Sequence, residues 1–139
     1  MEERDFADPA DIQEILETCK VIAVVGLSDK PDRPSHGVAQ YLKGAGYKII
    51  PVNPTKAEIL GEKVYPDLAS IPVHVDVVDV FRRSETVGPI AEQAIAIKAD
   101  ALWLQEGVIN VEAARAARRA GLKVVMDRCM LKEHKRQNR

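Results

Sequence analysis

The sequence predicts a Rossmann-like α/β domain, in which a doubly wound, parallel five-stranded sheet carries helices on both faces. Stretches typical of buried strands alternate with helical stretches along the chain. A length of 139 residues suits one domain, residues 1–139, with one core. Repeated strand–helix–strand units need right-handed crossovers, which build a parallel sheet. We expect the strand order 3-2-1-4-5, numbering the strands along the chain.

Five short apolar runs, rich in β-branched residues, are typical of strands that are covered on both faces. They are residues 21–25, 48–52, 75–81, 101–104 and 122–126. Gly26 ends the first run, and Asn53-Pro54 ends the second. Because proline donates no ladder hydrogen bond, we expect Pro51 near the end of the second strand or at a bulge.

Stretches with apolar residues at helical spacing separate these runs. The predicted helices are an opening helix over 8–19, a helix that stops at Gly46, residues 84–98 with a regular part from about Gly88, and 110–120. Asp8 and Asn110 are suitable N-caps. Residues 55–72 predict only a short turn at 68–71. Residues 128–139 predict a basic tail, which either attracts anions or is a solvated, frayed terminus.

Composition excludes several classes of protein. The net charge of −1, from 20 basic and 21 acidic residues, is too balanced for a general nucleic-acid binder. No apolar run approaches the ~20 residues that span a bilayer, so we expect no membrane partner. Cys19 and Cys129 form no disulfide framework, and no signal peptide precedes the acidic start Met1–Asp5. These features favour a cytoplasmic location.

The loop after the first strand favours a phosphate or diphosphate ligand. Gly26 lets backbone amides approach a ligand, and the helix that follows presents unpaired N–H groups at its start. Ser28 and Ser35 supply hydroxyl donors, and Lys30 and Arg33 supply positive charge. An ordinary loop with Ser35 as the helix N-cap explains the same residues about as well, since the dinucleotide fingerprint is incomplete.

The ends of the next two strands carry no acid. NAD-binding domains usually place Asp or Glu after the second strand to bind the adenine ribose, but here Asn53-Pro54 occupies that place. A neutral end tolerates a phosphate on the ribose, as in NADP or coenzyme A. Lys48, just before that strand, is a further candidate cation or a surface lysine. Arg82 and Arg83, after the third strand, suit bidentate phosphate binding or are surface arginines paired with nearby acids.

The segment Gln105-Glu106-Gly107 follows the fourth strand and is expected to face the Gly26 loop across the crevice at the carboxyl ends of the strands. Glu106 is a conceivable general base, but no second acid, nucleophile or orienting partner accompanies it. We therefore favour a binding or loop-fixing role for Glu106.

No metal site and no catalytic residue are expected. His36, His74 and His134 are scattered, with no metal-ligand spacing. Cys129 follows Arg128, a cation that lowers a nearby thiol's pKa, so a reactive cysteine that forms a mixed disulfide with a thiol ligand is one reading. An inert cysteine is the favoured alternative.

Segments spread from Val21 to His134 together resemble a known family. They are Val24–Ser28, Arg33–Ser35, Gly46–Lys48, Pro51–Pro54, Val80–Arg83, Trp103–Gly107 and Val125–Cys129. The family is that of the single-domain CoA-binding proteins, which are related to the CoA-binding domain of the succinyl-CoA synthetase α subunit. The resemblance implies coenzyme A, or an acyl-CoA, as the ligand.

The resemblance also implies a role for each loop. The turn at Gly26 holds the diphosphate, Pro51–Pro54 borders the adenosine, and the loops after the third and fourth strands complete the cleft. Lys48 matches a CoA-contacting lysine of the synthetase, and Lys30 and Arg33 are assigned to phosphate. The predicted site comprises Gly26, Leu27, Ser28, Lys30, Arg33, Ser35, Lys48, Val52, Asn53, Pro54, Phe81, Arg82, Arg83, Gln105, Glu106 and Gly107.

The difference from the synthetases is equally informative. Their phosphorylated histidine lies in a following domain, whereas this chain stops after the fifth strand and its tail. We therefore expect a binding module without catalytic machinery of its own, with room for an unidentified acyl-transfer partner protein. The alternative is an NAD(P)-dependent oxidoreductase or another nucleotide-binding enzyme, although 139 residues leave little room for a substrate-binding segment.

Overall fold

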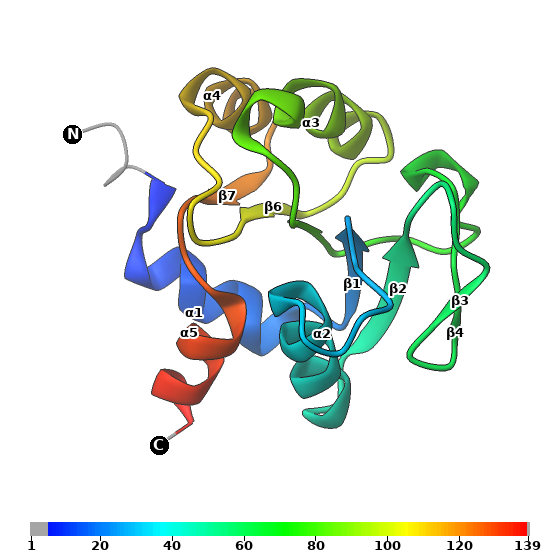
Figure 1. The fold of residues 1–139 in the computed structure, drawn as a ribbon. Helices are drawn as coiled ribbons and strands as arrows, with labels where there is room; N and C mark the ends of the chain where they lie inside the picture. Colours follow the sequence, from blue (N-terminus) through cyan, green and yellow to red (C-terminus); the bar gives the residue numbers. More distant parts are fainter. Residues whose placement is uncertain (1–5, 139) are drawn as a thin grey trace.

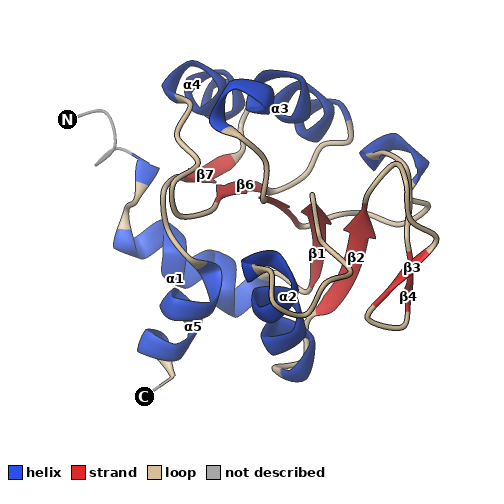
Figure 2. Ribbon diagram, in the orientation of Figure 1, coloured by secondary structure: helices blue, strands red, loops and turns tan. Residues whose placement is uncertain are grey.

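The computed structural model describes residues 6–138, so the acidic start Met1–Asp5 and Arg139 lie outside the described residues. The predicted fold class is confirmed, because five parallel strands form one sheet with helices on both faces (Figure 2). The strands are β1 (Val21–Val25), β2 (Lys48–Val52), β5 (Val77–Val80), β6 (Ala101–Leu104) and β7 (Lys123–Val125).

The helices form two layers around this sheet (Figure 1). They are α1 (Pro9–Thr18), α2 (Pro34–Gly44), α3 (Val87–Ala96), α4 (Val111–Arg119) and α5 (Met130–Gln137). Helices α1, α2 and α5 cover one face, and α3 and α4 cover the other. Asp8 and Asn110 cap α1 and α4 as predicted, accepting hydrogen bonds from Ala10 N and Ala113 N. None of these helices is long and apolar enough to span a membrane.

The expected strand order was wrong. The observed order is β2-β1-β5-β6-β7, so the third strand of the sheet along the chain pairs with the first and not with the second. The outer edge of β2 is already occupied, because Val52 forms a parallel bridge with Tyr65, and Asn53 N donates to Tyr65 O at 3.0 Å. At the other end of the sheet, Asp76 Oδ2 accepts the Val21 amide at 2.9 Å, which fixes β5 beside β1.

The connection between β2 and β5 contains more structure than the sequence predicted. A short hairpin of β3 (Glu58–Ile59) and β4 (Glu62–Lys63) precedes a 3-10 turn at Leu68–Ser70, where the turn was predicted. Leu60 and Gly61 join the hairpin strands with φ angles of 56° and 74°, as a type I′ turn requires. A leucine at the first of these positions hides the usual turn signal.

Pro51 is the penultimate residue of β2, near the strand end as expected. Its carbonyl oxygen accepts the Tyr65 amide at 3.0 Å on the outer side of the strand. The missing N–H of Pro51 therefore leaves no gap in the ladder between β1 and β2.

The predicted basic tail is largely a helix that packs against α1 and α2. Met130 is fully buried, and the buried carboxylate of Glu133 binds Arg136 at 2.7 Å. His134 Nδ1 lies 2.8 Å from the Tyr41 hydroxyl of α2. The apolar residues of α5 complete the core on this face, so residues 130–137 are not a solvated, frayed end.

Candidate functional site

A cavity of about 1010 Å³ lies at the carboxyl ends of the parallel strands. It lies where the chain connections reverse direction, because β1 connects to β2 on one side while β5 lies on the other side of β1. Open α/β sheets bind ligands at this place. The sequence-predicted residues that line it are Gly26, Ser28, Lys30, Arg33, Ser35, Val52, Pro54, Phe81, Arg82, Arg83, Gln105 and Glu106.

Gly26 brings the chain after β1 against the end of β5. Its φ angle is +88°, and a Cβ atom there would lie 2.4 Å from Phe81 O. The Gly26 amide donates to Val52 O at 3.1 Å, which also ties the turn to β2. Only glycine fits this close approach of three strand ends.

The loop between Gly26 and α2 is held by its own hydroxyl groups. Ser28 N donates to Ser35 Oγ at 3.0 Å, and Lys30 N donates to Ser28 Oγ at 3.1 Å. The N-cap of α2 is Arg33, without a side-chain hydrogen bond, so Ser35 is not the cap. Because Ser28 Oγ accepts from the Lys30 amide, its own hydrogen is available for donation at the cavity.

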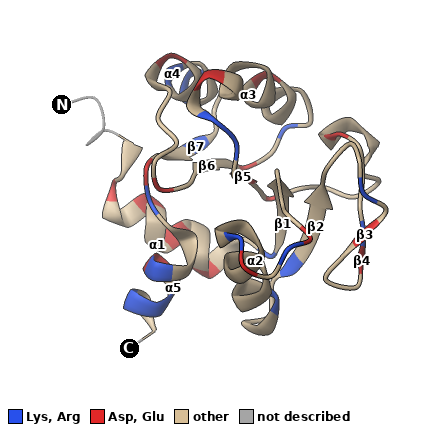
Figure 3. Ribbon diagram, in the orientation of Figure 1, with Lys and Arg blue, Asp and Glu red and all other residues tan. Residues whose placement is uncertain are grey.

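Cations gather on two sides of the cavity. Lys30 and Arg33 precede α2, and Arg82 and Arg83 follow β5 (Figure 3). Within residues 6–138, no carboxylate forms an ion pair with Lys30, Arg33 or Arg82, and Arg83 lies at a long 3.9 Å from Glu85. Lys30, Arg33 and Arg82 therefore bring positive charge, without an ion-pair partner among the described residues, to a cavity that Asp67 and Glu106 also line, an arrangement that suits an anionic ligand.

Four predicted residues do not line the cavity. Leu27 is fully buried in the core. The Asn53 side chain donates to Leu27 O at 3.2 Å and so holds the loop after β1. Gly107 lies between two lining residues, and its amide donates to Asp127 Oδ1 at 2.7 Å. Lys48 is exposed at the amino end of β2, the opposite end of the sheet.

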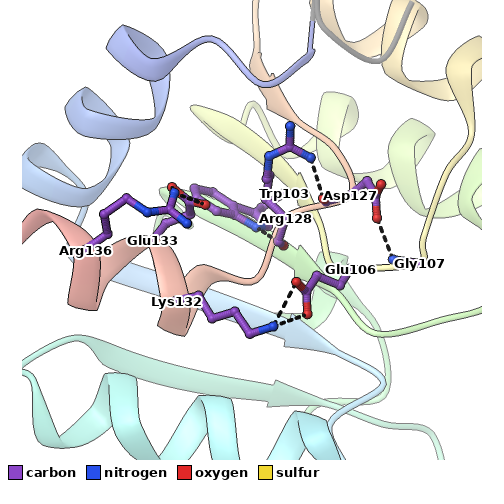
Figure 4. A network of polar contacts seen from close by, with 8 residues as sticks. All are labelled: Trp103, Glu106, Gly107, Asp127, Arg128, Lys132, Glu133 and Arg136. Atoms are coloured by element: carbon purple, nitrogen blue, oxygen red, sulfur yellow. Dashed lines mark hydrogen bonds and ion pairs between the residues drawn. The ribbon is translucent and has the colours of Figure 1, made fainter.

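β6 and the loop after it are tied to α5 and to the segment that leads into it (Figure 4). Lys132 Nζ contacts both carboxylate oxygens of Glu106 at 3.0 Å, and this hydrogen bond raises the pKa of Lys132. Trp103 Nε1 donates to Arg128 O at 2.9 Å on the same segment. Glu106 lines the cavity and also helps to fix its loop, and its role toward a ligand stays a prediction.

The sequence analysis missed a buried partner of the site. Asp79 lies inside β5 and is fully buried, and its Oδ1 accepts from Gln105 Nε2 at 2.6 Å. Burial raises the Asp79 pKa to about 7. Asp79 Oδ2 has no hydrogen-bond partner among the described residues. A single acid in the apolar run Val77–Val80 was the available signal.

A second polar group lies at the amino end of the sheet, away from the cavity. Ligand atoms of His74, Asp76 and Asp100 lie within 4.8 Å of one another. His74 Nε2 is 3.4 Å from Asp100, and Asp76 holds the Val21 amide. These contacts join the starts of neighbouring strands, which accounts for the group without an ion. The expectation of no metal site stays a prediction.

Neither cysteine lies in the cavity lining. Burial raises the pKa of Cys19 to about 11, which makes its thiol unreactive at neutral pH. Cys129 is half-buried at the N-cap of α5. The mixed disulfide considered for Cys129 stays untested.

Comparison with known proteins assigns the family. A family model described as a CoA binding domain matches residues 20–135. The chain belongs to this family of CoA-binding domains. The match covers all five strands of the parallel sheet and the whole cavity, and it agrees with the resemblance found in the sequence.

Two similar chains of about the same length have names that state no activity. An uncharacterized protein, YneT of Bacillus subtilis, is 47% identical over 125 residues, which are 90% of this chain and 93% of that protein. A hypothetical protein from Pyrococcus horikoshii OT3 has a structure with a TM-score of 0.91 and 43% identity, covering 95% of this chain and 93% of that one.

A further relative is a ligase of much greater length. Acetate–CoA ligase [ADP-forming] I of Archaeoglobus fulgidus is 26% identical over 121 residues, which are 80% of this chain but 18% of the ligase. The CoA-binding domain protein therefore corresponds to a small part of that ligase.

Proposed function

We propose that this CoA-binding domain protein binds coenzyme A, free or as an acyl-CoA, in the cavity at the carboxyl ends of its strands. The supporting observation is the convergence of Lys30, Arg33 and Arg82 on one cavity without carboxylate partners in residues 6–138. Coenzyme A carries a diphosphate and a 3′-phosphate, and cations that lack a protein partner suit such a ligand.

Each wall of the cavity suits one part of the ligand. The Gly26 turn, with the Ser28 hydroxyl beside it, suits the diphosphate, because the chain there approaches closely without a side chain in the way. Val52 and Pro54 offer an apolar surface for the adenosine. The residues directly after β2, Asn53–Lys56, include no carboxylate, and the acid on this side of the cavity is Asp67, further along the chain.

The protein is proposed to hold its ligand without transforming it. Glu106, the acid beside Gln105 at the cavity, is engaged by Lys132 at both oxygens. The relative whose name describes an activity on CoA, the acetate–CoA ligase, is several times longer than the domain that it shares with this chain. Acyl transfer would then belong to a partner protein.

Titration calorimetry with coenzyme A tests the proposal. We expect Arg82→Ala to weaken binding by about 1–3 kcal/mol, because a charged hydrogen bond to phosphate is lost. Arg119→Ala is the matched control, since Arg119 lies at the end of α4 outside the cavity lining. Absence of coenzyme A binding by the unmodified protein, or tighter binding of NADP, would contradict the proposal and favour an oxidoreductase-like site.

The remaining expectations are narrower. A cytoplasmic location is proposed, and the absence of a disulfide between Cys19 and Cys129 is compatible with it. No nucleic-acid or membrane partner is expected.

A further inference from the structure

Asp79 is placed where it opposes folding. Its carboxyl group is fully buried, and Oδ2 has no hydrogen-bond partner within residues 6–138. Burying a polar oxygen without a partner costs free energy, so an apolar residue would stabilise this position. The stability of the sheet therefore does not explain the acid. Its one hydrogen bond, from Gln105, leads to the cavity.

That hydrogen bond fixes the direction of the Gln105 amide. An ionised carboxylate only accepts hydrogen bonds, so it selects the amide nitrogen of Gln105. The nitrogen lies 2.6 Å from Asp79 Oδ1. The amide oxygen must then point the other way, and no donor of the described chain contacts it. Because Gln105 lines the cavity, its oxygen is an acceptor available to a ligand.

The order of the strands indicates which part of the ligand meets this acceptor. If the adenosine lies over β2 and the diphosphate over β1, as in the proposed function, the rest of coenzyme A extends over β5 and β6. Gln105 follows β6 directly. The part of coenzyme A beyond the diphosphate is the pantetheine arm, which carries amide N–H donors.

We propose that Asp79 orients the Gln105 amide so that its carbonyl oxygen accepts a hydrogen bond from an amide N–H of the pantetheine arm. Gln105 is then a specificity-determining residue, and Asp79 is a positioning residue that acts through it. The inference rests on the proposed coenzyme A site. It adds that the site makes a hydrogen bond to the pantetheine arm that a nucleotide without the arm cannot make.

Calorimetry at pH 8, where Asp79 is largely ionised, tests this with coenzyme A and with ADP in its 3′-phosphorylated form (below, ADP), which differs from coenzyme A by lacking the arm. Gln105→Met removes the acceptor at similar size, so coenzyme A binding should weaken about five- to tenfold while ADP binding changes less than twofold. Asp79→Leu should weaken coenzyme A binding similarly, yet raise the thermal unfolding midpoint. Gln40→Met, on the exposed side of α2, is the matched control.

The double variant separates positioning from an independent effect. If Asp79 acts only through Gln105, Asp79→Leu combined with Gln105→Met should bind coenzyme A no more weakly than Gln105→Met alone. Additive losses, a lowered unfolding midpoint for Asp79→Leu, or equal losses for ADP and coenzyme A would each overturn the inference. If the unmodified protein binds ADP but gains nothing from the arm, the inference fails while the nucleotide site survives. If it binds neither, the proposed function fails as well.

Discussion

The two sides of the cavity differ in whether their charged groups are paired within the protein. On the α2 side, the loop that contains Lys30 and Arg33 is held by serine hydroxyls, and its cations have no carboxylate partners in residues 6–138. On the β6 side, Glu106 is tied to Lys132 of α5, and Gly107 is tied to Asp127 in the segment before α5. The cations of the α2 side are unpaired within this part of the chain and open to a ligand. The polar groups of the β6 side are used in contacts within the protein. This division suits the proposed ligand, whose phosphates are anionic and whose pantetheine arm is uncharged.

Alanine substitutions of one glycine on each side should give the largest difference in unfolding free energy between the two sides. Gly26→Ala places a methyl group 2.4 Å from Phe81 O at a φ of +88°, so we expect a loss of about 4 kcal/mol in unfolding free energy and no coenzyme A binding. Gly107→Ala is the matched control, because Gly107 has a similar φ of +83° but nothing within 4 Å of the new methyl group. It should cost about 1 kcal/mol. Urea unfolding measures both, and equal losses would show that contact with β5 is unimportant.

The pH dependence of stability tests the buried acid on the rigid side. Burial raises the Asp79 pKa from 3.8 to about 7, so the folded state prefers the protonated acid. This preference stabilises the fold fully below pH 3.8 and is lost as the pH rises through 7. We expect Asp79→Asn to become more stable than the unmodified protein by a few kcal/mol between pH 4 and pH 8, since one pKa unit is worth about 1.4 kcal/mol. A difference that stays constant with pH in urea unfolding would contradict an ionising Asp79.

The smallest effect should come from the exposed pair between Lys132 and Glu106. Lys132→Met should change stability by less than about 1 kcal/mol, because both side chains are largely exposed. It leaves the Glu106 carboxylate uncompensated at the cavity, so coenzyme A binding should weaken about threefold at low salt. Adding Glu106→Gln should restore binding. Failure of that rescue in calorimetry would mean that Lys132 itself contacts the ligand.

Local patterns predicted most of the elements. Apolar β-branched runs located β1, β2 and β6 to the residue, and Asp8 and Asn110 marked helix starts because capping is a local interaction. The strand order was wrong because it depends on the edge that Tyr65 occupies, a contact outside any repeating pattern. Helix α5 was missed because its charged residues outnumber the apolar ones that fix it.

The candidate site also contains residues that local patterns could locate and residues that they could not. Gly26, Arg82 and Gln105 line one cavity, as expected for residues that follow parallel strands, because such strands bring their carboxyl ends to one edge; their roles in binding stay predictions. Lys48 was a candidate from its place before the second strand and from the resemblance, and the structure sets it at the amino end of β2, opposite the cavity. Asp79 and the pairing of Lys132 with Glu106 join positions 26 residues apart, and no local signal announces such a contact.

The bridge between Val52 and Tyr65 also affects how molecules of this protein meet one another. An uncovered border strand offers rows of N–H and C=O groups to any other chain and invites intermolecular sheet growth. Here the polypeptide covers the β2 border with its own Tyr65 backbone, and Pro51 lacks an N–H on that side. The segment that occupies the expected place of the third strand thereby leaves fewer backbone groups of the β2 border open to another chain.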